Sequence, residues 1–141
     1  MRPAASTTAR SNDLAVITCH YNFAGYSSPR ANLHRFLRLM RYSSIPVYGV
    51  ELYLSGQEPV TTTEPGWRQF RISERAILWQ KEALLNAAEK LVPARYKKIA
   101  WVDADVIPNS ADWICDLSKK LDEHPIVQPF DYCYWTSREG E

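Results

Sequence analysis

The stretch IAWVDADVIP, residues 99–108, runs a short apolar segment directly into two carboxylates and then ends at a proline. Its four consecutive apolar residues, 99–102, are typical of a strand buried on both faces of a parallel sheet. Alternate residues of a strand point to the same side, so Asp103 and Asp105 would project together, about 6–7 Å apart. Ligands of open α/β sheets bind at the carboxyl ends of such strands. The stretch therefore predicts both a parallel sheet and a site at its edge.

Two carboxylates held side by side predict a divalent cation. Like charges this close repel each other, and hard cations such as Mg²⁺ and Mn²⁺ prefer oxygen ligands. The alternative interpretation makes Asp105 a turn residue before Pro108, with Asn109 or Ser110 capping the next helix. We favour the metal site because an apolar strand precedes the pair, since a D-x-D triplet alone is a weak signal.

The segments on either side alternate between strand and helix patterns. Strands are predicted at 14–18, 47–54, 67–72 (a short edge strand) and 126–130, besides the one that bears the aspartates. Helices are predicted after an N-cap at Ser28, at 74–91 after a cap at Ser73, and at about 111–123. This order predicts an α/β fold: a Rossmann-like, mostly parallel sheet with helices on both faces.

Each predicted helix has one apolar stripe that we expect to face the sheet. The stripe residues recur at helical spacing. They are Leu33, Phe36, Leu37 and Met40 in the first helix, Ile77, Leu84, Ala88 and Leu91 in the second, and Ile114, Leu117 and Leu121 in the third.

Size and composition predict one ordinary globular domain. The chain has 141 residues, 45% of them hydrophobic and 23% charged, with a formal net charge of +1. This balance gives no overall attraction to nucleic acid or acidic membranes. Residues 1–12 are expected to form a disordered tail, which leaves 13–141 as the domain.

Further signals narrow the class of protein and its compartment. Cys19, Cys115 and Cys133 are odd in number and lack C-x-x-C spacing, which argues against disulfides and structural zinc and favours a reducing, cytoplasmic location. No apolar run approaches the length of a membrane span. The basic stripe on the first helix, which includes Arg30 and Arg38, is typical of a solvated face, so we expect no nucleic-acid partner.

Three stretches resemble the nucleotide-sugar-binding half of GT-A glycosyltransferases of the family 2 type. Asp103-Ala104-Asp105 matches the D-x-D motif, and AVITCHYN (15–22) looks like the opening strand with its T/P-x-Y-N loop. LWQKEALLN (78–86), followed by YKKIAWVDAD (96–105), is similar to a W-Q-K-E-x-L-L-N helix and the D-x-D strand of small microbial and viral members. The resemblance implies a UDP- or GDP-sugar donor, Mn²⁺ or Mg²⁺ against its diphosphate, and transfer to an unknown acceptor.

The resemblance gives roles to the residues at the strand ends. Asp105 is expected to coordinate the cation, and Asp103 to contact the ribose or the metal through water. Thr18, Tyr21 and Asn22 lie at the end of the first strand and would be beside the nucleotide, with Tyr21 stacked on the base and Asn22 hydrogen-bonded to the base or the ribose. A packing role for Tyr21 is equally open.

Two more candidates come from the second strand and the second helix. Glu51 is an acid among apolar neighbours and is a candidate acceptor for a uracil or guanine N–H, with simple outward alternation into solvent as the alternative. Lys81 is a candidate phosphate contact, with an ordinary solvated lysine as the alternative.

Two rival interpretations stay open. The chain ends soon after its last predicted strand, so we expect the acceptor half of a GT-A enzyme to be missing. One alternative is therefore a truncated or non-catalytic nucleotide-binding domain that is completed by a partner or a second copy. The other is a haloacid-dehalogenase-like phosphatase, with Asp103 as nucleophile and Asp105 as general acid. That family needs its motif near the N-terminus, so we rank it below glycosyl transfer.

Overall fold

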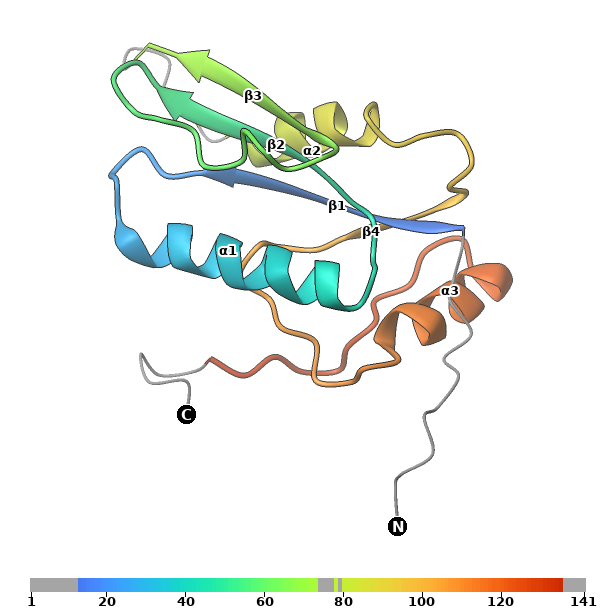
Figure 1. The fold of residues 1–141 in the computed structure, drawn as a ribbon. Coiled ribbons are helices and arrows are strands. Elements are labelled where there is room, and N and C mark those ends of the chain that lie inside the picture. Colours follow the sequence, from blue (N-terminus) through green and yellow to red (C-terminus); the bar gives the residue numbers. More distant parts are fainter. Residues whose placement is uncertain (1–12, 74–77, 79, 136–141) are drawn as a thin grey trace.

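Four strands and three helices make up the described part of the chain (Figure 1). The structure is a computed structural model that describes residues 13–73, 78 and 80–135. Its elements are β1 (Leu14–Tyr21), α1 (Ser27–Tyr42), β2 (Val47–Leu54), β3 (Trp67–Ile72), α2 (Lys81–Glu89), β4 (Lys98–Trp101) and α3 (Trp113–Glu123).

The strands form a parallel sheet in the order β3-β2-β1-β4. β1 lies inside the sheet, where Val16 aligns with Val47 of β2 on one side and Ile17 aligns with Trp101 of β4 on the other. From β1 the chain first builds outward through β2 and β3, and then crosses back to add β4 on the opposite side of β1. The predicted α/β class with a mostly parallel, Rossmann-like sheet is confirmed.

Helices cover both faces of the sheet because successive strand residues point to opposite faces. Leu14 and Val16 pack with the apolar side of α1 and with Leu117 of α3. Ile17 packs on the other face, against Leu84 and its neighbours in α2. Figure 1 shows α1 and α2 on opposite sides of β1 and β2. The predicted stripe of α1 is buried at every one of its positions.

The strand that precedes the aspartates differs from its prediction. β4 pairs with β1 alone within the described residues, so it is an edge strand, and Ile99 and Trp101 are 37% and 55% exposed. The predicted strand at 126–130 does not form. Pro129 has no N–H to give to a ladder, which weakens pairing there, and Ile126 is fully solvent-facing at 88% exposed.

The helix starts also differ from prediction. α1 begins at Ser27, with Tyr26 rather than Ser28 at the N-cap and no capping side chain. α3 begins at Trp113, and neither Asn109 nor Ser110 caps it, because the Ser110 hydroxyl instead accepts the N–H of Asp112 in a turn before the helix.

The second helix is shorter than its pattern suggested. α2 begins at Lys81, with Gln80 at its N-cap, and Leu78 is not helical. The predicted first turns, 74–77 with Ile77 and also Trp79, lie outside the described residues. Leu84 and Ala88 are buried as expected, whereas Leu91 follows the helix and is half-buried. No helix within the described residues is both long and apolar enough to cross a bilayer.

Gly49 is required by a close contact between neighbouring strands. Trp67 of β3 aligns with Gly49, and a Cβ built on Gly49 would lie 2.6 Å from two ring carbons of Trp67. The indole therefore lies on the bare backbone of β2, and no larger residue fits without moving the ring.

We expect Gly49→Ala to lower the free energy of unfolding by about 1–3 kcal/mol, because the added methyl overpacks this contact. Urea denaturation measures the loss. Gly49→Ala combined with Trp67→Leu should lose less than the sum of the two single changes, since the smaller side chain makes room. An unchanged midpoint for Gly49→Ala would contradict this account.

Candidate functional site

The two aspartates lie on a turn that leaves β4 and stays against β1. The strand ends at Trp101, the N–H of Val102 donates to the carbonyl of Ile17 at 3.1 Å, and the N–H of Val106 donates to the carbonyl of Asp103 at 3.1 Å. The predicted alternation of Asp103 and Asp105 along a strand is therefore wrong, because both residues belong to a turn. Their placement at the carboxyl end of the strand agrees with the prediction.

Lys81, the first residue of α2, holds the Asp103 carboxylate. Its Nζ lies 2.7 Å from Oδ1 and 2.8 Å from Oδ2 of Asp103. Burial works against the lysine charge, but the hydrogen bond and the charge of Asp103 outweigh it and raise the pKa of Lys81 above its usual value. Nζ also lies 5.5 Å from the ring centroid of Trp101. The start of α2 is thus tied to the end of β4.

Two residues from the end of β1 complete this group. Cys19 and Tyr21 alternate onto the α2 face of the sheet, where both pack beside the core of that face. Tyr21 stacks on Phe23 with ring centroids 5.6 Å apart. We call the set of residues gathered here the switch-point cluster. It consists of Cys19, Tyr21, Lys81, Trp101 and Asp103.

The titratable groups of the switch-point cluster lie close enough to influence one another. Burial raises the pKa of the Cys19 thiol to about 11, against a lowering by Lys81 and with further raising by Asp103 and Glu82. Burial also raises the pKa of Tyr21, which responds to the same lysine and carboxylates. Cys19 and Tyr21 are therefore neutral at pH 7, and the charges of the cluster are those of Lys81 and Asp103.

The cluster lies where the strand order reverses. β1 leads to β2 on one side, while β4 lies on the other, so their carboxyl ends flank the point at which the chain changes direction across the sheet. Open α/β sheets bind ligands in the crevice at this point. The N-terminus of α2 reaches the same edge, since Lys81 contacts Asp103 there, and first-turn N–H groups favour anions.

The available donors fit a cation that shares its ligands with a substrate. Asp103 and Asp105 supply carboxylate oxygens, which suit Mg²⁺ and Mn²⁺. Asp105 is exposed and has no ion pair within the described part of the chain. No group of three or more metal-binding side chains occurs among residues 13–73, 78 and 80–135. Phosphate oxygens and water would have to complete the coordination of any cation held here.

Glu51 lies on the other face of the sheet and has a structural role. It is 3% exposed, so its outward alternation into solvent is wrong. Its carboxylate accepts the N–H of Val60 at 2.9 and 3.0 Å, the N–H of Thr61 at 2.8 Å and the Thr61 hydroxyl at 2.6 Å. Because loop groups use the carboxylate, we leave Glu51 out of the proposed ligand contacts.

Thr18 and Asn22 are engaged or covered near the end of β1. Thr18 is 1% exposed, and its hydroxyl has no hydrogen-bond partner within the described residues. The Asn22 amide donates to the carbonyl of Tyr26 at 2.6 Å and accepts the N–H of Tyr26 at 3.0 Å, which shapes the turn before α1. A ligand contact by either side chain stays a prediction and requires these groups to be uncovered.

His20 is a buried polar residue that the sequence reasoning did not single out. It aligns with Glu51 across β1 and β2 and is 7% exposed. Burial lowers the pKa of His20, the Glu51 carboxylate opposes that shift, and His34 adds to it. Extending the first predicted strand beyond Thr18 would have placed His20 on the α1 face by alternation.

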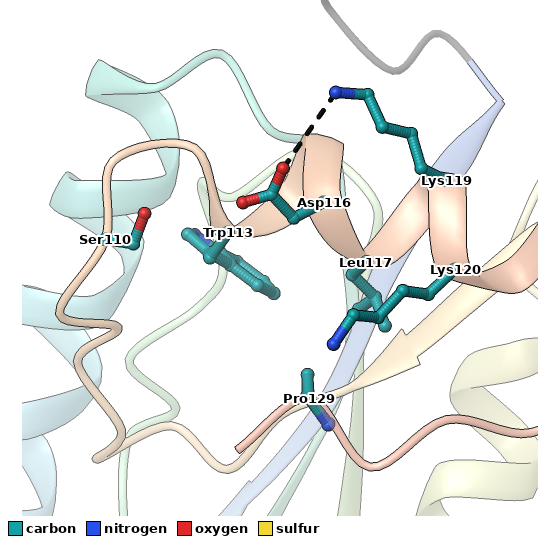
Figure 2. A pocket seen from close by; sticks show the side chains of 7 residues that line it. All are labelled: Ser110, Trp113, Asp116, Leu117, Lys119, Lys120 and Pro129. Carbon is teal, nitrogen blue, oxygen red and sulfur yellow. Dashed lines mark ion pairs between the residues drawn. The ribbon is translucent and has the colours of Figure 1, made fainter. Parts of the chain in front are cut away.

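Two surface hollows lie away from the switch-point cluster. One, of about 410 Å³, lies between α3 and Pro129 and contains the 4.0 Å pair of Lys119 and Asp116 (Figure 2). The other, of about 230 Å³, lies at the amino edge of the sheet beside Arg95. Neither is lined by any residue of the cluster.

Comparison of the chain with protein-family models, with curated proteins and with solved structures found no match.

We expect Cys19 to react slowly with iodoacetamide at pH 8, because its pKa near 11 keeps the thiol protonated. A variant that keeps only Cys19 should be alkylated at least about tenfold more slowly than one that keeps only the exposed Cys133. Mass spectrometry over time measures both rates. Equal rates in the folded proteins would contradict the burial of Cys19.

His20 should make the free energy of unfolding fall as the pH is lowered below about 6.5. The pKa of His20 is lower in the folded chain than its ordinary value of 6.5. Below about pH 6.5 the unfolded chain therefore binds more protons than the folded chain, and this proton binding favours unfolding. His20→Gln should flatten this dependence in urea titrations between about pH 7.5 and about pH 5.5, which lie one unit above and one unit below 6.5. His124→Gln, at an exposed position, should keep it. A full slope in His20→Gln would refute the assignment.

Proposed function

We propose that the chain binds a nucleoside-diphosphate sugar together with Mn²⁺ or Mg²⁺ at the switch-point cluster, as the donor-binding part of a GT-A-type glycosyltransferase. The observation that carries the proposal is the position of the Asp103-Ala104-Asp105 turn. It follows β4 directly, contacts β1, and lies where the strand order reverses. The resemblance of the flanking stretches to GT-A enzymes supports the same reading.

The charges of the site suit a diphosphate with its cation. Asp105 is the residue best placed to bind the cation directly, since it is exposed and forms no ion pair with any residue that the structure describes. Asp103 lies two residues earlier on the same turn and shares its carboxylate with Lys81. When bound, the cation would stabilise the negative charge that develops on a diphosphate leaving group. The side chain of Lys81 is 23% exposed and can contribute a second positive charge from the start of α2.

The aromatic residues of the site suit the base of a nucleotide. Tyr21 and Phe23 form a stacked pair at the end of β1, and Trp101 is 55% exposed at the end of β4. Flat apolar rings beside a polar crevice are the usual surface on which a planar base packs. No described residue is assigned as a catalytic base, and transfer to an acceptor follows from the resemblance alone.

We expect UDP or GDP to bind in the presence of Mn²⁺ and to lose most of its affinity in EDTA, as measured by titration calorimetry. Asp105→Asn should weaken the metal-dependent binding by roughly tenfold or more, because a neutral amide is a poor ligand for a hard cation. Asp116→Asn, on the exposed face of α3, is the matched control and should bind like the wild type.

Absence of metal-linked binding in the wild type, or unchanged binding by Asp105→Asn, would refute the proposal. Phosphate release from p-nitrophenyl phosphate that is lost in Asp103→Asn would favour the phosphatase interpretation instead.

A further inference from the structure

The ion pair at the site covers the carboxylate that a cation would use. Lys81 Nζ lies almost equally far from the two oxygens of Asp103, at 2.7 and 2.8 Å, so it sits across the fork of the carboxylate. A divalent cation bound to that carboxylate would take the same region of space. An ammonium and a divalent cation at such short separation also repel each other strongly.

We infer that Lys81 is a resident cation that competes with the divalent metal for Asp103 and moves to the phosphates when the nucleotide binds. The inference deepens the proposed function and rests on it for the identity of the ligand. In the free protein Lys81 neutralises Asp103. In the loaded site the metal would take both carboxylates, and Lys81 would pair with the diphosphate.

Among the residues that the structure describes, Lys81 has few partners other than Asp103. Cys19 and Tyr21 are close enough to affect it but are neutral at pH 7, since burial raises the pKa of both. The Trp101 ring, 5.5 Å from Nζ, offers only a weaker cation–π contact. Glu82, whose charge acts on Cys19, is exposed to solvent. A bound diphosphate would be the first strong alternative to Asp103, and the flexible lysine stem allows the change of partner.

The competition predicts that one substitution at Lys81 strengthens metal binding and weakens nucleotide binding. Removing the lysine charge frees Asp103 for the metal but takes away a phosphate contact. If Lys81 only stabilised the fold, its removal would instead weaken the binding of both the metal and the nucleotide. The exchange also predicts that nucleotide and metal strengthen each other's binding by the same factor, as linkage requires.

The test uses Mn²⁺ alone, followed by electron paramagnetic resonance of the free ion. Lys81→Met should bind Mn²⁺ about fivefold or more tightly than the wild type, and Lys81→Arg, which keeps the charge, should not. Lys90→Met, at the far end of α2 and exposed, is the control for loss of a surface lysine and should match the wild type. At saturating Mn²⁺, Lys81→Met should bind UDP about tenfold more weakly.

Unchanged or weaker Mn²⁺ binding by Lys81→Met, with its circular dichroism spectrum intact, would overturn the inference. If Lys81→Met fails to fold, Lys81→Gln provides the same loss of charge with a polar side chain. Tighter Mn²⁺ binding without any nucleotide binding would confirm the competition and refute the proposed function. Metal-dependent nucleotide binding by the wild type, without tighter Mn²⁺ binding by Lys81→Met, would support the proposed function and refute the competition.

Discussion

The pairing of β1 with a parallel strand on each side is the constraint on which the rest of the structure depends. β2 and β4 both align with it, so β1 is buried between strands as well as between helices. The return of the chain from β3 through α2 to β4 then brings the start of α2 and the end of β4 to the carboxyl end of β1. The contact between Lys81 and Asp103, 22 positions apart, is a consequence of that crossover.

The two faces of β1 form different environments at the carboxyl end of the sheet. On the α1 face, His20 lies beside Glu51, whose carboxylate fixes the loop at Val60 and Thr61, and these groups are buried. On the α2 face, the switch-point cluster combines partly exposed aromatic rings with an ion pair at the surface. Strand alternation separates the two environments by a single residue. The groups on the α1 face are buried in the protein, whereas the α2 face leaves charged groups accessible to a ligand.

Much of the fold could be predicted because it follows from local patterns. β2 and β3 begin and end at the predicted residues, and the apolar stripe of α1 is buried. The exposure of β4 and the partner of Lys81 could not, because both depend on which distant segments pair. The start of α2 was misjudged because Leu78 and Gln80 fit a helical pattern without being helical. Cys19 and Trp101 were missed as site residues because the first strand was predicted to end at Thr18 and the strand before the aspartates was predicted to be buried on both faces.

In the proposed function, a cation and a nucleotide diphosphate meet at the carboxyl ends of β1 and β4. Paramagnetic broadening of backbone amide signals by Mn²⁺ in the presence of UDP, with Mg²⁺ as the diamagnetic reference, tests it most directly. We expect broadening centred on Asp103–Asp105 and extending to Tyr21 and Lys81, with weaker broadening at the amino edge of the sheet, at Asp13 and Lys98. Broadening centred at the amino edge or on α3, or none at all, would contradict it.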